Sequence, residues 1–271
     1  MQSQYPLSSI PITNRDLSFS GGGGAIKSDQ ISLNPANISV ANQALNVHTQ
    51  LLPTGISLLS LHSIYPKNET TYFASISNLN FGTLRDGISN ETFSANDFMI
   101  MGGLKGHLFQ IISIGASLSY TLSKIEKSMS QSLLLSVGVR TEITKNKIAG
   151  GLVVRNLGFI FDYYGESKEK IPYQFQFSGL MKPKHLPALL FSDIIIQENI
   201  ESYSLITGME IYPRDGFIIR LSDSGLFQNG FELTSLAFGI QLNLKNLTID
   251  LASRNLISAG FVNGVTLSKK F

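Results

Sequence analysis

Few residues in this sequence combine the types and the spacing that catalysis or metal binding requires. The chain has no cysteine, which excludes disulfides, thiolate metal sites and cysteine nucleophiles. Its histidines show none of the i, i+2 or i+4 spacings of a metal-binding pair; they are His48, His62, His107 and His185. Serine is abundant, but no Gly-x-Ser-x-Gly nucleophile elbow occurs. We therefore expect neither an enzyme nor a resident metal or cofactor.

A glycine run at residues 21–24 continues as Ala25-Ile26-Lys27-Ser28 and resembles a phosphate-binding loop. Such a loop needs glycine directly before its lysine, so that backbone N–H groups can surround the phosphates, and Ile26 occupies that position. We interpret the run as a turn or as a place of close backbone packing. The net charge of +2 is carried by scattered basic residues, so neither a nucleotide nor a nucleic acid is expected as a partner.

Charged side chains of both signs fall on the polar faces of segments that otherwise alternate between apolar and small polar residues. The charges with the clearest placement are Arg140, Glu142, Arg155, Arg220, Asp250 and Arg254. If these segments enclose a lumen, the charges would pair across it or hold another part of the chain inside, because buried charges need partners. Asp193 lies within the apolar run 189–196, where it either points into the lumen or marks a differently placed strand.

From residue 44 the chain consists of consecutive segments about ten residues long, separated by turn signals such as Pro53-Thr54-Gly55. Alternation is clear in 112–122, where Ile, Ala, Leu and Tyr occupy one face and Ser, Gly and Thr the other. About fourteen strands are predicted, an even number with lengths suited to tilted membrane strands. Their ranges are 44–51, 55–64, 70–80, 97–107, 109–123, 130–143, 147–157, 171–181, 187–197, 201–212, 216–223, 231–244, 246–254 and 258–271.

The composition favours a transmembrane barrel over a soluble β-sandwich, which also alternates. Charged residues make up 15% of the chain, whereas soluble domains carry about 25%. The polar faces are mostly small residues, where a solvated sheet would more often carry Lys and Glu. We therefore predict an all-β fold, a transmembrane antiparallel barrel of residues 44–271, in contact with outer-membrane lipid.

The two ends of the chain differ from the alternating segments. Residues 1–43 contain prolines and the glycine run and alternate poorly, so we expect an irregular segment packed into or under the barrel. No signal peptide is visible, and a barrel must cross the inner membrane, so we expect that the signal has been removed. At the other end, Val265, Leu267 and Phe271 share one face of a final strand. An aromatic last residue is typical of outer-membrane barrels and serves as an insertion signal, although Lys269 stands where a second aromatic is usual.

Several short motifs, in order, resemble the PorV/PorQ family, relatives of the long-chain fatty-acid transporter barrels. They are the stretch Arg15 to Gly22, the stretch Ser32 to Ile38 with its Asn-Pro-Ala, and the later segments 154–158 and 171–175. The acidic spacer of the family is reduced here to Asp29, and the total length is nearer that of the PorQ members. The resemblance implies a fourteen-stranded bacterial outer-membrane barrel whose N-terminal segment is an inner plug. It makes Arg15, Gly21, Gly22, Asn34, Pro35 and Ala36 structural plug residues.

Three functions remain open from the sequence. The resemblance implies a non-enzymatic component of a type IX secretion system that docks surface or periplasmic secretion proteins. The alternative is a channel for hydrophobic small molecules, as in the fatty-acid transporters, and the third is a soluble β-protein. A transporter needs a lumen lined by Phe, Leu and Ile; the predicted lumen faces are small and polar, which favours docking.

Overall fold

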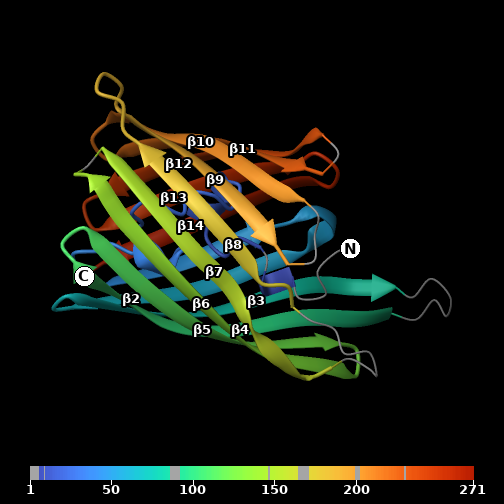
Figure 1. Cartoon of the computed structure of the whole chain (residues 1–271). Helices are drawn as coiled ribbons and strands as arrows, with labels where there is room; N and C mark the ends of the chain where they lie inside the picture. The colour runs from blue at the N-terminus through green and yellow to red at the C-terminus, as the bar shows by residue number, and fades with distance from the viewer. Residues whose placement is uncertain are drawn as a thin grey trace.

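The protein, in a computed structural model, is a closed barrel of fourteen antiparallel strands, each hydrogen-bonded to its neighbours in sequence, with β1 pairing with β14 (Figure 1). The structure describes residues 6–8, 10–85, 92–145, 147–163, 171–198, 202–228 and 230–271. The strands are β1 (Ala44–Leu51), β2 (Ser57–Lys67), β3 (Thr70–Arg85), β4 (Thr92–Phe109), β5 (Ile112–Ile125), β6 (Ser128–Thr144), β7 (Ile148–Asp162), β8 (Gln174–Met181), β9 (Ala188–Gln197), β10 (Tyr203–Arg214), β11 (Phe217–Phe227), β12 (Phe231–Leu244), β13 (Leu247–Leu256) and β14 (Gly260–Lys270). The predicted fold and strand number are confirmed.

Several strands are longer than predicted, β3 and β4 among them. β3 extends beyond residue 80, and β4 begins at Thr92 where 97 was expected. The pairing of β3 with β4 shifts register between Asn80 and Thr83, and Gly82 between them has a φ of +72°. Such a bulge absorbs extra residues and lets the ladder continue, which glycine permits at little steric cost.

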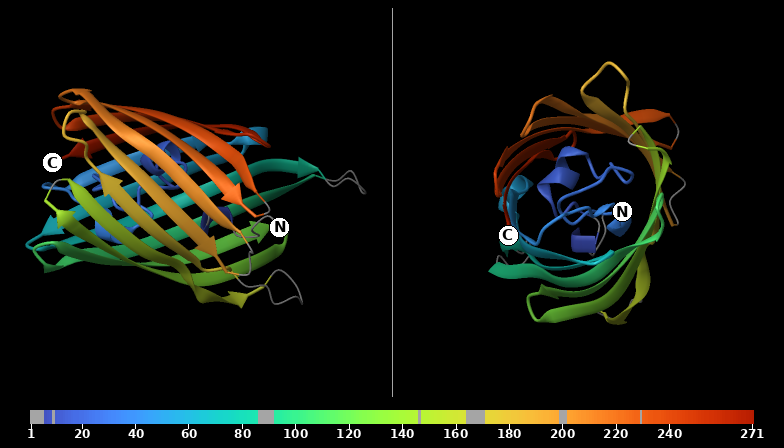
Figure 2. Two further views of the ribbon diagram at one scale, coloured as in Figure 1. Left: turned by 45° about the horizontal axis from the view of Figure 1, so that its top comes forward. Right: turned by 90° about the vertical axis from the view of Figure 1, so that its left-hand side faces the viewer.

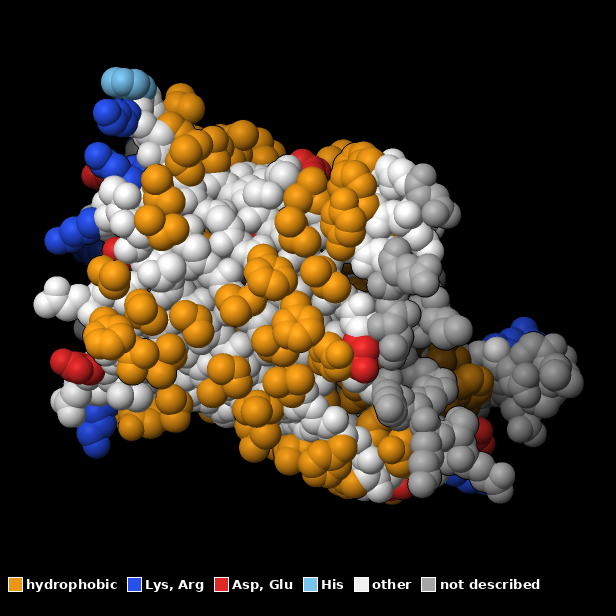
Figure 3. All heavy atoms as spheres, in the orientation of Figure 1, with side chains coloured by type: hydrophobic (Ala, Val, Ile, Leu, Met, Phe, Trp, Pro, Cys, Tyr) orange, Lys and Arg blue, Asp and Glu red, His pale blue; other side chains and the backbone are white. Residues whose placement is uncertain are grey.

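Side chains alternate between a buried inner face and an apolar outer face, as the period of a strand requires. Leucine, isoleucine, valine and phenylalanine side chains on the outer face are 36% or more exposed in many strands. Figure 3 shows apolar side chains scattered across the visible wall, with most of the visible Lys and Arg side chains at one end. Apolar side chains on the outer face can contact lipid directly. The closed barrel also satisfies its own backbone hydrogen bonds, which lipid could not do. Among the described residues, no helix has the length and apolar character needed to cross a membrane.

Residues 10–39 lie inside the barrel, and we call this segment the plug (Figure 2). It contains α1 (Asn14–Ser18) and η2 (Pro35–Asn37), and the short η1 (Pro6–Ser8) precedes it. Thr13 accepts a hydrogen bond from the Asp16 N–H as the N-cap of α1. We name the end where β1 begins and β14 ends the C-terminal rim, and the other end the opposite rim.

Candidate functional site in the plugged lumen

Arg220 of β11 is the centre of a buried ion network between the plug and β10 to β13. Its guanidinium donates to Glu210 Oε2 from Nε at 2.8 Å and to Asp250 Oδ2 from Nη1 at 2.9 Å. Arg15 of the plug lies 3.6 Å from the same Glu210 oxygen, and Gln30 of the plug donates to Asp250 at 3.1 Å. The side chains of the four charged residues are at most 5% exposed. The plug is therefore held here by charges that screening hardly weakens.

Phe19 of the plug packs among these charges. The guanidinium carbons of Arg15 and Arg220 lie 5.2 and 5.6 Å from the centre of its ring. The ring also meets Phe191 of β9 edge to face, with centroids 4.9 Å apart. Two cations over one desolvated ring add cation–π attraction to the ion pairs. Phe19, the C-cap residue of α1, thus contacts both arginines of the network.

The glycine run, residues 21–24, packs directly against β8 to β10. This is the close backbone packing that was one of the two interpretations of the sequence. A Cβ on Gly22 would lie 2.7 Å from Asp193 Oδ2, and one on Gly24 would lie within 3.0 Å of β8 side-chain atoms. Asp193 points inward, is 1% exposed, and accepts hydrogen bonds from the N–H groups of Gly23 and Gly24. Gly21 has a φ of +87°, which glycine adopts readily.

The Asn-Pro-Ala segment seats the plug on β5 and β6. Asn34 caps η2 by accepting from the Ala36 N–H at 3.0 Å, and its Nδ2 donates to Val139 O at 3.3 Å. Pro35 lies against Gly115, where any Cβ would approach its carbonyl carbon to 2.5 Å. Asn34 and Pro35 therefore hold the plug against the barrel wall at β5 and β6.

The predicted lumen charges lie on inward-facing positions, but they do not all pair. Arg140 contacts Glu142 at 3.2 Å, and Lys27 of the plug joins the same carboxylate. Arg140 also donates to the Ala25 carbonyl at 2.8 Å. The two remaining cations, Arg155 and Arg254, have no ion pair among the described residues; Arg254 donates only to Ser235 Oγ, at 3.0 Å.

The lumen wall opposite the Arg220 network carries a cluster of apolar side chains beside small polar ones such as Ser60 and Ser77, which corrects the expectation of uniformly small and polar lumen faces. Its core consists of Leu58, Ile64, Phe73, Leu79, Met99 and Met101 of β2 to β4, packed against Leu7, Ile12, Ile31 and Ile38. These side chains are at most 8% exposed. We call this contact the apolar side of the plug, and the contact made by the Arg220 network the charged side.

Three cavities lie against the plug. A polar one of about 200 Å³ is lined by Arg254, Gln197 and Ser204, toward the opposite rim. A second of about 60 Å³ lies on the apolar side, lined by Ile12, Ile31, Met99, Met101 and Leu134 and by the small polar residues Ser117, Ser119 and Ser136. Both are also lined by Leu33 and Arg155, so they adjoin. The third, of about 300 Å³, lies toward the C-terminal rim and is lined by Lys27, Arg140 and Glu142.

The histidines, interpreted from the sequence as four unrelated positions, include one pair in contact. The rings of His48 and His62 lie 4.2 Å apart on the inner faces of β1 and β2, and both are fully buried. His48 Nδ1 lies 2.6 Å from Thr266 Oγ1, which also accepts from Asn14 of the plug at 2.9 Å. Metal-ligand spacing within one strand could not reveal this pair. The hairpin turn at residues 53–55 was the available signal, because it brings the polar faces of two predicted strands together.

Asp16 is the titratable group of the plug whose ionisation is most affected by burial. Its carboxyl is 2% exposed, and its Oδ2 has no hydrogen-bond partner among the described residues. Burial raises the pKa of Asp16 from 3.8 to about 6, although the positive charges of Arg15 and Arg155 oppose that shift.

The residues of the proposed insertion signal lie at the outer surface. Val265, Leu267 and Phe271 are 40%, 49% and 61% exposed, and the first two belong to the outward face of β14. Lys269 lies over the Phe271 ring, 5.1 Å from its centre. This face is accessible to a membrane or to an insertion factor, and the role as a signal stays a prediction.

Comparison with solved structures supports the barrel fold. The toluene transporter TodX of Pseudomonas putida is 9% identical, with a TM-score of 0.77 over 98% of this chain and 99% of that one. The toluene transporter TbuX of Ralstonia pickettii is 11% identical, with a TM-score of 0.69 over 96% and 98%. A FadL homologue of Pseudomonas aeruginosa is 10% identical, with a TM-score of 0.66 over 97% and 99%. No family model and no curated protein sequence matches the chain. At these identities the likeness is one of fold, and no match supports the PorV/PorQ family in particular.

Proposed function

We propose that this protein is a bacterial outer-membrane channel for hydrophobic small molecules, closed at rest by its plug. The observation that carries the proposal is the apolar side of the plug, where a small cavity lined by Ile31, Met99 and Leu134 adjoins a wider polar cavity. Apolar lining with a few polar groups at the entrance is the usual character of a site for such ligands. The toluene transporters with the same fold support this choice of substrate class.

The proposed route enters from the opposite rim, passes the polar cavity and reaches the apolar one beside Leu33. The 60 Å³ cavity is too small for a drug-sized ligand, whose sites measure about 300–1,000 Å³. Passage therefore requires the plug to yield on its apolar side. Van der Waals contacts there are individually weak, and methionine side chains such as Met99 and Met101 adapt readily.

Uptake of radiolabelled toluene by cells that express the protein tests the proposal, with empty-vector cells as the baseline. Leu134→Gln and Leu135→Gln form a matched pair on β6. Leu134 faces the cavity and is 3% exposed, whereas Leu135 faces outward and is 39% exposed. We expect uptake above baseline for the wild type, a several-fold lower rate for Leu134→Gln and an unchanged rate for Leu135→Gln.

Uptake at the baseline in correctly assembled wild-type protein would overturn the proposal. Docking of secretion-system proteins, as the PorV/PorQ resemblance implies, would then be the function to pursue. A pull-down from native membranes in mild detergent is the measurement for that alternative.

A further inference from the structure

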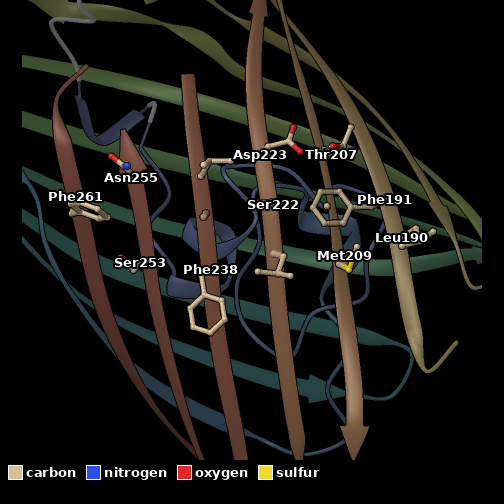
Figure 4. A pocket seen from close by; sticks show the side chains of 14 residues that line it. Leu190, Phe191, Thr207, Met209, Ser222, Asp223, Phe238, Ser253, Asn255 and Phe261 are labelled. Atoms are coloured by element: carbon tan, nitrogen blue, oxygen red, sulfur yellow. Dashed lines mark hydrogen bonds between the residues drawn. The ribbon is translucent and has the colours of Figure 1, made fainter. Parts of the chain in front are cut away.

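We propose that a groove on the outer wall, over β9 to β14, binds a membrane lipid that carries N–H and O–H donors at the top of its acyl chains. Figure 4 shows this open groove, whose volume is about 880 Å³. Four of its lining side chains face outward and are 41–59% exposed: Leu221, Leu236, Phe238 and Phe261. Their exposure shows that the groove opens to the lipid-facing surface, away from the lumen.

A short row of polar groups crosses the apolar groove. Thr207 and Asp223 are register partners on β10 and β11, and the Thr207 hydroxyl donates to Asp223 Oδ2 at 2.9 Å (Figure 4). The same row continues through Leu236 to Asn255 of β13. The row therefore places the Asp223 carboxylate and the Asn255 amide in one line across the wall. The Thr207 hydroxyl already donates its hydrogen bond to that carboxylate.

Asp223 lies within the apolar band. Phe227 follows it at the second outward position toward the opposite rim. There the Tyr203 ring stacks on Phe227 with centroids 4.9 Å apart, and the Phe231 ring lies tilted against it with centroids 5.0 Å apart. Aromatic residues of this kind mark the membrane interface in barrels. Toward the C-terminal rim, outward residues of β11 are Leu221 and Ile219. Asp223 thus sits just inside the interface, at the level where lipid backbones give way to acyl chains.

An ionisable side chain facing hydrocarbon is costly and by default indicates a function. Thr207 is the one hydrogen-bond partner of the Asp223 side chain among the described residues, and it leaves most acceptor positions of the carboxylate free. A lipid with an amide N–H and a hydroxyl at this level would satisfy them, whereas an ester-linked glycerolipid has no donor there. Its chains would lie against Leu221, Leu236 and Phe238, which supply the apolar contact.

Native mass spectrometry of the purified protein tests the proposal with two lipids that share headgroup and chain length. One is an amide-linked, hydroxylated ceramide phosphoethanolamine and the other is a diacyl phosphatidylethanolamine. We expect at least fivefold more adduct with the amide lipid. Asp223→Leu should abolish that preference, and Thr207→Val should leave it reduced. Both changes make the lipid face more apolar, so assembly is retained, which heat-modifiable migration on gels checks.

Ser63→Leu is the control, because it removes a polar group from the outward face of β2, away from the groove. The preference should persist in this variant. Equal adducts of the two lipids with the wild type, or a preference that survives Asp223→Leu, would overturn the proposal. A dimer of the chain that Asp223→Leu disperses would also overturn it, because a second copy would then be the occupant.

Discussion

The plug is held on its charged side and its apolar side by different interactions, and under the proposed function this difference decides which side opens. On the charged side, Arg220 and Arg15 share Glu210 in a buried network with defined geometry. Removing any member leaves an uncompensated charge, so this contact is all-or-none. On the apolar side, Ile31 and Met101 contribute non-directional contacts that can be exchanged for contacts with a hydrophobic ligand. Both sets of contacts are consistent with a plug that stays fixed at its charged side and moves away from the wall at its apolar side when a hydrophobic ligand binds there.

The largest effect that we expect comes from Arg220→Leu, because it leaves Asp250 buried without a cation and leaves Glu210 with Arg15 alone, 3.6 Å away. Breaking a buried ion network of this kind costs about 3–5 kcal/mol. Urea unfolding in detergent, followed by far-ultraviolet circular dichroism, measures the loss. Arg214→Leu is the control: Arg214 is an exposed residue on β10, and its replacement should change stability by less than about 0.5 kcal/mol.

Equal stability of Arg220→Leu and the wild type would show that the charged side does not fix the plug. The comparison between the two sides would then lose its basis. Arg220→Lys sharpens the test, because lysine keeps the charge but cannot donate in a fixed fork to two carboxylates. Its stability should lie between those of the wild type and the leucine variant.

A smaller effect should appear in the pH dependence of stability, through Asp16. Its pKa of about 6 in the folded protein lies above the ordinary 3.8, so the folded state binds the proton more tightly. The stability that this proton confers is complete below about pH 4 and is lost as the pH rises through 6. Two pKa units correspond to about 3 kcal/mol, so Asp16→Asn should gain on the wild type by up to about that amount between pH 4 and pH 7.

The measurement is the difference in unfolding free energy between Asp16→Asn and the wild type at several pH values. Other titratable groups act in both proteins and largely cancel in this difference. A difference that stays constant from pH 4 to pH 8 would contradict the burial of an ionisable Asp16 in the plug.

The sequence was sufficient for the barrel, because alternation with a period of two is a local property that each strand displays. The sequence was insufficient wherever the register between paired strands decides which residues meet. His48 and His62 meet because β1 and β2 pair with a particular offset, which no spacing within either strand records. The apolar cluster on the lumen wall was missed for a related reason: Met99 and Met101 share a face whose direction follows only from how β4 pairs with its neighbours.

Asp223 illustrates how a boundary error hides a site. The run Ser222-Asp223-Ser224-Gly225 has the composition of a turn, so the predicted strand ended at residue 223. The structure continues β11 to Phe227, with a register shift toward β12 at Gly225. A residue expected at a rim is therefore placed inside the apolar band. Tertiary pairing overrode the local turn signal there.

The smallest effect distinguishes the two sides by an identical chemical change on each. Ile31 lies on the apolar side and Ile26 lies beside Phe19 and Phe191 on the charged side; both are 1% exposed. Replacing either with valine removes one buried methyl group and should cost about 0.5–1.5 kcal/mol. The stability losses should therefore be similar, so stability alone cannot separate the two variants.

Toluene uptake should separate them. Ile31 lines the cavity that we propose as part of the route, so Ile31→Val enlarges it and lowers the work of displacing the plug there. Ile26→Val loosens a contact that Arg220 and Arg15 continue to hold, because its neighbour Phe19 lies beneath both guanidiniums. We expect faster uptake by Ile31→Val and the wild-type rate for Ile26→Val. If Ile26→Val were the faster of the two, the hydrophobic route would run along the charged side. The plug would then open at its charged side and stay fixed at its apolar side, the reverse of the arrangement that we propose.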